Sequence, residues 1–158
     1  MGCNLTIRQM AEEDLGDVES LYKDLYREQK EAGMVMDFNA EELSDMLQIQ
    51  LKSKFFISLV LADEKNVKGF AVGSIIRTSK KYKLEGQDFI GFINDIYLEP
   101  DARKSGSGQK LLDELENRFR ERGIRYAELH VIEGNENGKG FWRRVGYRDV
   151  IRVMYKHL

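Results

Sequence analysis

One six-residue segment constrains the fold of this chain more than any other: Arg103, Lys104, Ser105, Gly106, Ser107 and Gly108. It follows a strand-like apolar run, 89–98, and precedes a helix-like run, 109–122. The first N–H groups of a helix have no partner within the helix, and the helix dipole favours negative charge there. The two glycines let the backbone approach a ligand closely, while the arginine and the lysine add positive charge. The segment therefore predicts a phosphate-bearing ligand at the start of a helix.

The hydrophobic periodicity of the remaining chain predicts the strands and helices around this turn. We expect strands over 5–9, 55–62, 67–78, 89–98, 126–132 and 147–158, and helices over 11–33, 39–51, 109–122 and 141–145. The helix after the 89–98 strand is a crossover, so this strand and the 126–132 strand should run parallel. The expected fold is α/β, with a mixed, mostly antiparallel sheet and helices on both faces, in a single domain over residues 1–158.

Composition restricts the classes of protein that fit. The formal net charge is −2, with basic and acidic residues well mixed, so we expect no nucleic-acid partner. No apolar run is long enough to span a membrane, and the sequence lacks a secretory signal. The single cysteine, Cys3, excludes an internal disulfide, and His130 and His157 lie far apart, so we expect no metal site. These features favour a cytoplasmic protein.

One N-terminal pattern would change this expectation. Residues 1–6 match the N-myristoylation pattern, and Cys3 would be available for palmitoylation. The pattern is loose, because three of its positions are free. Leu5 and Ile7 also begin the first expected strand, which a lipid anchor would have to spare. We therefore expect no lipidation.

Three known phosphate motifs do not fit the glycine segment. A P-loop needs Lys and then Ser or Thr directly after its last glycine, but Gly108 is followed by Gln109 and Lys110. A dinucleotide fingerprint needs a small residue three positions after Gly108, where this chain has Leu111. Protein-kinase signatures are absent from the sequence.

A fourth pattern matches in two parts of the chain. The first part, Leu98-x-Pro100-x-x-Arg103-x-x-Gly106-x-Gly108, resembles the acetyl-CoA signature of the GNAT N-acetyltransferase superfamily. The second part resembles the next strand and helix of that family: Leu129-x-Val131-x-x-x-Asn135, followed by Phe141-Trp142-x-x-x-Gly146-Tyr147. The two parts have the order and separation of the family, and the expected elements cover nearly the whole chain.

This resemblance implies a fold, a co-substrate and a reaction. It implies the GNAT fold, in which the 89–98 and 126–132 strands splay apart and the pantetheine arm of acetyl-CoA lies beside Tyr97 and Leu98. It also implies that the pyrophosphate binds N–H groups from the glycine segment: Lys104, Ser105, Gly106, Ser107 and Gly108, with Arg103 adjacent. Asn135 and the helix after it are implied to contact the cofactor from the other side. A primary amine would attack the thioester directly, and a backbone N–H near Leu98 would stabilise the oxyanion.

Two positions depart from the family pattern. Many members have a Tyr as general acid where this chain has Trp142, and an indole N–H does not deliver a proton. We expect Trp142 to shape the cofactor wall by packing, and the thiolate to be protonated by water, Tyr97 or Tyr147. Some polyamine-type members carry Glu where this chain has Asn94, which makes Asp95 the first candidate base, with a purely structural role as the other interpretation. Strand alternation puts Asn94 and Asp95 on opposite faces unless a bulge intervenes.

The acceptor amine is the least determined part of this hypothesis. We expect its site to come from the 29–39 connection, the helix around Leu43 and the 79–87 loop. Acidic residues near that region favour a cationic small-molecule or peptide amine, although a solvated helix face has the same composition. Glu28 is a weaker candidate base, and His130 is expected to face solvent. The alternative function is a CoA-binding regulatory or interaction module with little catalysis. A homodimer is common in proteins of this fold.

Overall fold

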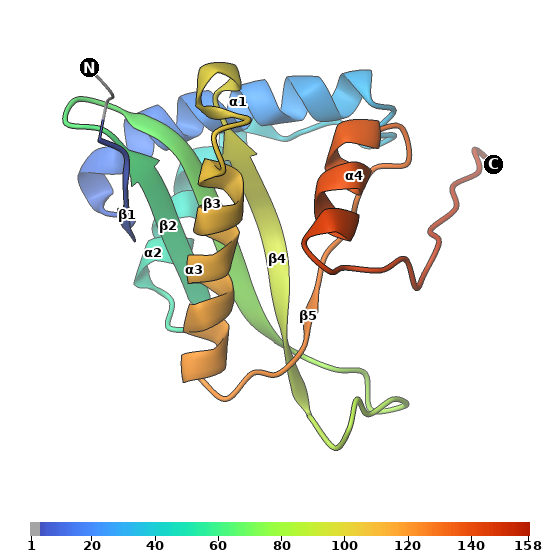
Figure 1. Ribbon diagram of the computed structural model, residues 1–158. Helices are drawn as coiled ribbons and strands as arrows, with labels where there is room; N and C mark the ends of the chain where they lie inside the picture. Colours follow the sequence, from blue (N-terminus) through green and yellow to red (C-terminus); the bar gives the residue numbers. More distant parts are fainter. Residues whose placement is uncertain (1–3) are drawn as a thin grey trace.

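Five strands form one sheet, in which the spatial order β1-β2-β3-β4-β5 follows the sequence. The structure is a computed structural model that describes residues 4–158 (Figure 1). The strands are β1 (Thr6–Gln9), β2 (Phe56–Ala62), β3 (Val67–Arg77), β4 (Phe89–Leu98) and β5 (Ala127–Glu128). Neighbouring strands are antiparallel except β4 and β5, which are parallel. This confirms the mixed, mostly antiparallel sheet. The start of the lipidation pattern, residues 1–3, lies outside the described range.

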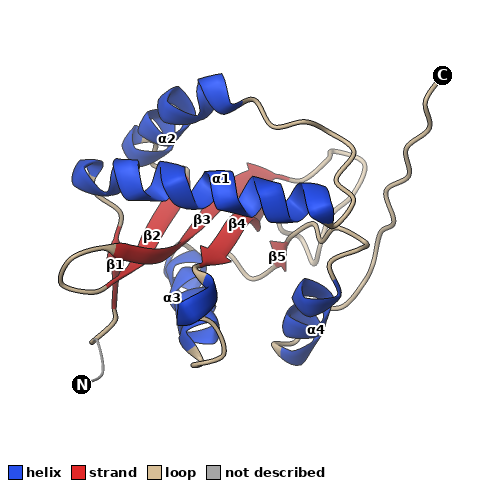
Figure 2. Cartoon of the chain, turned by 90° about the horizontal axis from the view of Figure 1, so that it is seen from above, coloured by secondary structure: helices blue, strands red, loops and turns tan. Residues whose placement is uncertain are grey.

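Helices cover both faces of this sheet (Figure 2). On one face lie α1 (Leu15–Glu31) and α2 (Leu43–Lys52); on the other lie α3 (Ser107–Glu121) and α4 (Glu136–Arg144). Short 3-10 turns, η1 (Glu12–Asp14), η2 (Ala40–Glu42) and η3 (Pro100–Ala102), precede α1, α2 and the glycine segment. The helices hold to the sheet by apolar stripes at helical spacing, with these residues buried: Val18, Leu21, Tyr22 and Leu25 on α1; Leu111, Leu112, Leu115 and Phe119 on α3.

No described helix is both long enough and apolar enough to cross a membrane.

Helix α3 packs unusually close to the sheet because two glycines face it. A Cβ atom at Gly73 would lie 2.6 Å from the Phe119 ring, and one at Gly91 would lie 2.9 Å from it. Real side chains do not approach so closely, so only glycine at these positions lets Phe119 lie flat on β3 and β4. The C-terminal half of α3 therefore packs directly on the backbone of β3 and β4.

The last part of the chain differs from the sequence-based expectation. Of the expected 126–132 strand, only Ala127 and Glu128 are paired, with Gly91 and Phe92 of β4. The expected strand or hairpin over 147–158 is wrong for this structure, because these residues form no strand and run outward from the end of α4 (Figure 1). Their strand propensity is high, but a strand also needs a backbone partner, and no described segment pairs with them.

Candidate active site

The glycine segment forms a turn whose backbone donors are free. Gly106 is the N-cap of α3 and has a left-handed backbone with φ of 82°, which glycine adopts at little cost. Lys104 also has a positive φ, 62°. Among the described residues, the N–H groups from Lys104 to Gln109 have no hydrogen-bond acceptor. The turn therefore presents a concave row of donors at a helix N-terminus, an arrangement that binds anions.

The serine hydroxyl groups of the turn form hydrogen bonds within it. Ser105 Oγ donates to the carbonyl of Ala102 at 3.0 Å and lies 2.8 Å from Ser107 Oγ. Ser107 is buried, whereas Lys104, Ser105 and Gly106 are exposed. The donors are thus open to solvent, while the turn beneath them is held in place.

Beside the turn, β4 has a free edge. The pairing of β4 with β5 is limited to Gly91 and Phe92, so in the described part of the chain the edge from Ile93 to Leu98 has no strand partner. The two strands therefore splay, as the resemblance implies. At the open end, a Cβ atom on Gly108 would lie 3.8 Å from Phe141 and 3.9 Å from Leu98. The free edge of β4, the turn and α4 consequently meet at one place.

The side chain of Arg103 is directed towards α1 and binds a carboxylate there. Its Nε donates to the carbonyl of Leu98 at 2.8 Å, and its Nη2 donates to both carboxylate oxygens of Glu28, at 2.9 and 3.1 Å. The guanidinium also lies 5.0 Å from the centroid of the Tyr97 ring. The Tyr97 hydroxyl donates to Glu28 at 2.8 Å, and burial, together with this carboxylate, raises the pKa of Tyr97 to about 12. The sequence suggested Arg103 and Glu28 separately and did not show that they bind each other.

A bulge in β4 brings Asn94 and Asp95 to the same face. Val72 of β3 pairs with Asp95 and Gly73 pairs with Ile93, so Asn94 is the extra residue. Both side chains face α1 and α2, because Asn94 lines a pocket with Gln50 while Asp95 contacts Tyr22. Strand alternation would put these two side chains on opposite faces, and the bulge, which the sequence analysis gave as the exception, puts them on one face.

Asp95 is the carboxyl group with the most altered acidity near this edge. Tyr22 Oη donates to Asp95 Oδ2 at 3.0 Å. Burial under α1 raises the pKa of Asp95 to about 7, although the hydrogen bond from Tyr22 acts in the opposite direction. A carboxyl group that titrates near neutral pH can accept and release a proton under ordinary conditions.

On the other side of the free edge, α4 carries the remaining candidates. Asn135 caps α4, since its Oδ1 accepts a hydrogen bond from the N–H of Gly138 at 2.9 Å. Trp142 is partly buried and makes edge-to-face contacts with Phe141 and Tyr147, at 5.1 and 5.3 Å between ring centroids. These contacts are those of a packing residue.

The two other candidate proton carriers have different surroundings. The hydroxyl of Tyr147 donates to Glu116 at 2.9 Å, and burial, followed by the charge of Glu116, raises the pKa of Tyr147. The His130 side chain is 71% exposed and lies near Glu128, at 3.7 Å, so it faces solvent as expected.

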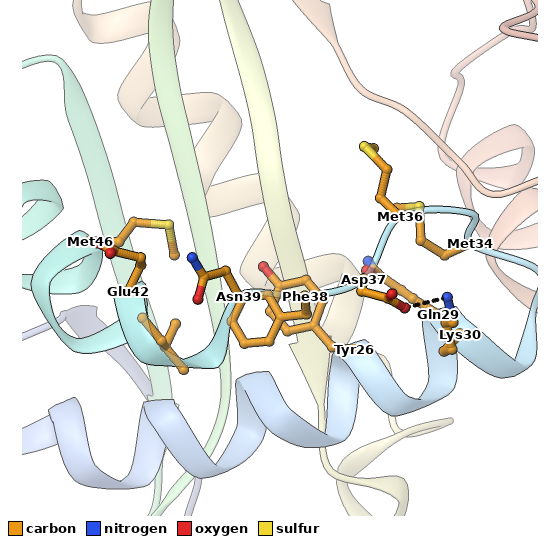
Figure 3. A pocket seen from close by; sticks show the side chains of 11 residues that line it. Tyr26, Gln29, Lys30, Met34, Met36, Asp37, Phe38, Asn39, Glu42 and Met46 are labelled. Atoms are coloured by element: carbon orange, nitrogen blue, oxygen red, sulfur yellow. Dashed lines mark hydrogen bonds and ion pairs between the residues drawn. The ribbon is translucent and has the colours of Figure 1, made fainter. Parts of the chain in front are cut away.

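A pocket of about 540 Å³ opens between the C-terminal half of α1, the 34–39 connection and the start of α2 (Figure 3). Tyr26 and Phe38 stack at 3.6 Å between ring centroids and form an aromatic wall. Three methionines add an apolar, adaptable lining: Met34, Met36 and Met46. Lys30 and Asp37 neutralise each other at 2.6 Å. Apart from Tyr26, the lining residues come from two of the three segments that were expected to form the acceptor site, the 29–39 connection and the helix around Leu43, and none comes from the 79–87 loop.

A second pocket, of about 460 Å³, shares Glu42 and Met46 with the first. Gln50 and Asn94 line it, and within the described residues Gln50 Oε1 and Asn94 Oδ1 are buried without a hydrogen-bond partner. Unsatisfied buried acceptors are rare in proteins and point to a donor that is not part of the chain. The sequence did not single out Gln50 or Tyr22; the signal was a polar group on the buried face of a helix, which must find a partner.

The family of the chain follows from its similarity to known proteins. The sequence model of the acetyltransferase (GNAT) family matches residues 16–147. The chain belongs to this family. The match contains β4, the glycine turn and α4, which are the elements that form the site above.

Solved structures share the GNAT fold over nearly their whole length. The aminoglycoside N-acetyltransferase AAC(6')-Iy in complex with CoA has a TM-score of 0.82 at 18% identity, covering 100% of this chain and 97% of that one. A GCN5-related N-acetyltransferase from Ralstonia eutropha JMP134 has a TM-score of 0.78 at 24% identity, covering 98% and 99%. A predicted acetyltransferase from Clostridium acetobutylicum, solved with acetyl-CoA, has a TM-score of 0.78 at 19% identity, covering 97% and 96%. No curated protein sequence matches the chain significantly.

Proposed function

We propose that this protein transfers the acetyl group of acetyl-CoA to a primary amine. The observation that carries the proposal is the row of free N–H donors from Lys104 to Gln109 beside the free edge of β4. A pyrophosphate needs many donors and little steric obstruction, and a pantetheine amide needs an unpaired strand edge. Both requirements are met within one region of a GNAT-family chain.

Backbone groups and a few side chains around this region are proposed to bind acetyl-CoA. The N–H groups of the turn hold the pyrophosphate, and the backbone beside Tyr97 and Leu98 pairs with the pantetheine arm. Arg103 supplies positive charge next to the turn and also fixes the carbonyl of Leu98. Asn135 starts α4, and Trp142 packs as part of the wall on that side. That AAC(6')-Iy was solved with CoA, and the clostridial protein with acetyl-CoA, supports this assignment.

The acceptor amine is proposed to reach the thioester from the α1 and α2 side. The first pocket offers an aromatic and methionine-lined surface, and Glu42 joins it to the second pocket, where Asp45 adds another carboxylate. Neither carboxylate forms an ion pair within the described residues, so both favour a cationic amine. The structure of AAC(6')-Iy with a CoA–acetylneamine bisubstrate analogue supports a small-molecule amine as acceptor.

The reaction requires two proton transfers. The attacking ammonium loses a proton before its nitrogen forms a bond to the thioester carbonyl, and Asp95 is proposed to receive that proton, directly or through water. The backbone N–H near Leu98 stabilises the oxyanion. When the carbon–sulfur bond breaks, the thiolate of CoA takes up a proton. We assign this proton to water, because the hydroxyls of Tyr97 and Tyr147 already donate to carboxylates.

The experiment that tests the function measures thiol release from acetyl-CoA with a panel of amines. The panel contains an aminoglycoside, a linear polyamine, an aromatic monoamine and a lysine peptide. Amine-dependent thiol release together with an acetylated product supports the proposal. Binding of acetyl-CoA without transfer to any amine would favour the alternative, a CoA-binding regulatory module, which the packed Trp142 at the position of the usual Tyr makes reasonable.

A further inference from the structure

The second pocket contains polar groups that the chain itself leaves without partners. Gln50 is only 7% exposed, and its Oε1 atom has no hydrogen-bond partner within the described residues. The Oδ1 atom of Asn94 is buried and unpaired in the same way. Both residues line one cavity of about 460 Å³. A buried acceptor without a donor costs free energy, so a ligand that donates hydrogen bonds here would stabilise the pocket.

The charges around this pocket favour a cationic donor. Glu42 and Asp45 line it, and no basic residue does so in the part of the chain that the structure describes. Their attraction for a cation is strongest where water is partly excluded, as it is beside the buried amides. A cation gains from both the carboxylates and the amide oxygens, whereas a neutral donor gains from the oxygens alone.

The walls of the pocket determine which kind of group carries this cation. Met46, Ile49 and Phe56 complete the lining, and all three are apolar. Such walls bind an alkyl chain and disfavour a strongly hydrated group. A primary ammonium has three N–H donors, and the pocket offers two amide oxygens and a carboxylate. An alkylammonium group therefore matches both the walls and the acceptors.

This pocket lies too far from the expected position of the thioester for the bound nitrogen to be the one that reacts. Asn94 precedes Leu98 by four residues in β4. That separation corresponds to about 10 Å or more along the strand, even with the bulge at Asn94. An attacking nitrogen must approach the reacting carbon to within about 3.5 Å. A nitrogen held beside Asn94 is therefore a second, unreactive nitrogen of the acceptor.

This inference rests on the proposed acetyl transfer: we propose that the acceptor is a linear diamine whose second ammonium group binds Gln50 and Asn94 while its first amine attacks the thioester. Glu42 and Asp45 supply the opposite charge. A monoamine of the same length leaves both buried amides unpaired. Sites built to bind a polar group discriminate strongly against an analogue that lacks it. Gln50 and Asn94 are thus specificity-determining residues.

Acetylation of amines of equal length tests this specificity. The substrates are diaminooctane, octylamine and aminooctanol, which carry an ammonium, a methyl and a hydroxyl group at the far end. The kcat/KM for diaminooctane should exceed that for each of the other two about tenfold, because only the ammonium satisfies both the amides and the carboxylates. Diaminopropane, whose second nitrogen is too close to the first to reach Gln50, should be no better than octylamine. Equal kcat/KM values for diaminooctane and octylamine would overturn the proposal.

Substitutions in α2 test the residues themselves. Gln50→Met keeps the size of the side chain and removes its acceptor, so the ratio of kcat/KM for diaminooctane to that for octylamine should fall about tenfold. Asp45→Asn, at an exposed position, should lower the same ratio by removing charge. Gln48→Met, on the exposed face of α2, is the matched control and should leave the ratio unchanged. A ratio that is unchanged in both Gln50→Met and Asp45→Asn contradicts the assignment of this pocket.

A binding measurement separates this proposal from the proposed function. With CoA present, which carries no acetyl group to transfer, diaminooctane should raise the Tm of wild type by more than octylamine does at the same concentration. The excess should be lost in Gln50→Met and kept in Gln48→Met. If no amine releases thiol from acetyl-CoA but the excess persists, the pocket binds the diamine and only the proposed transfer fails. If octylamine and diaminooctane release thiol equally and raise the Tm equally, the transfer stands and the diamine proposal is wrong.

Discussion

Arg103 binds Glu28 through two hydrogen bonds and thereby ties the glycine turn to α1. The two residues are 75 positions apart in sequence. The same guanidinium holds the carbonyl of Leu98 at the end of β4. One cation thus joins the proposed pyrophosphate site, the free strand edge and the helix that borders the acceptor pocket.

Charge substitutions in this pair should change the affinity for acetyl-CoA in opposite directions. Arg103→Gln removes positive charge beside an anionic ligand and frees the Leu98 carbonyl, so the affinity should fall about tenfold. Glu28→Gln leaves the guanidinium without a competing carboxylate, so the affinity should rise about threefold. Both side chains are more than a third exposed, so folding stability should change by less than about 1 kcal/mol. Calorimetric titration at one ionic strength measures the affinities, and equal values in all three proteins would remove Arg103 from the site.

The pH dependence of turnover tests Asp95 as the base. With a pKa of about 7, its carboxylate form increases as the pH rises through neutrality, so kcat/KM should increase through the same range. Asp95→Asn should lower kcat about a hundredfold, leave the affinity for acetyl-CoA unchanged and abolish this rise. Tyr22→Phe removes the hydrogen bond that lowers the Asp95 pKa, so the rise should move to higher pH. Unchanged turnover in Asp95→Asn would leave Asp95 with a structural role only.

The same carboxyl group should also affect stability. Burial raises the pKa of Asp95 from 3.8 to about 7, so between these pH values the folded state binds a proton that the unfolded state releases. The free energy of unfolding therefore falls as the pH rises through this window. Asp95→Asn removes the effect and still accepts a hydrogen bond from Tyr22. The free energy of unfolding of the variant minus that of wild type should therefore increase by about 2 kcal/mol from pH 5 to pH 8, as measured by denaturant unfolding. If this difference is the same at both pH values, Asp95 titrates in its ordinary range.

Substitution of Gln50, whose side-chain oxygen is unpaired, tests whether the acceptor amine binds in the second pocket. Gln50→Met keeps the shape of the side chain and removes a buried acceptor without a partner, so stability should rise by about 1 kcal/mol. If an N–H group of the acceptor amine donates a hydrogen bond to Gln50 Oε1, the KM for the best amine should also rise severalfold in Gln50→Met, with no change in acetyl-CoA affinity. Gln48→Met, at an exposed position of α2, is the matched control and should change neither quantity. A more stable variant with an unchanged KM would show that the amine does not reach the second pocket.

The elements with strong local signals could be predicted from the sequence. The apolar run that ends before Pro100 predicts the bounds of β4, 89–98, and the glycines after it predict the start of α3 to within two residues. The parallel pairing of β4 and β5 follows from the helix between them. Such features depend on neighbouring residues and on the handedness of short connections, which a single sequence carries.

Features that depend on distant parts of the chain could not be predicted in this way. The bulge at Asn94 is a property of the register between β3 and β4, so composition alone left two possible faces for Asp95. The direction of Arg103 depends on Glu28, which comes from another helix. The 148–158 segment has the propensity of a strand, yet no described segment of the chain pairs with it. Local patterns state what a segment can become, and packing decides what it becomes.

Calorimetric titration of acetyl-CoA into three proteins tests the central claim most directly: wild type, Gly106→Asp and Gly106→Asn. Asp and Asn have the same shape and both tolerate the left-handed backbone of Gly106, so they differ only in the charge placed among the free N–H donors. Acetyl-CoA should bind wild type, bind Gly106→Asn more weakly, and show no detectable binding to Gly106→Asp. Absence of binding to wild type, or equal binding to all three proteins, would contradict the proposal that this turn holds the pyrophosphate of acetyl-CoA.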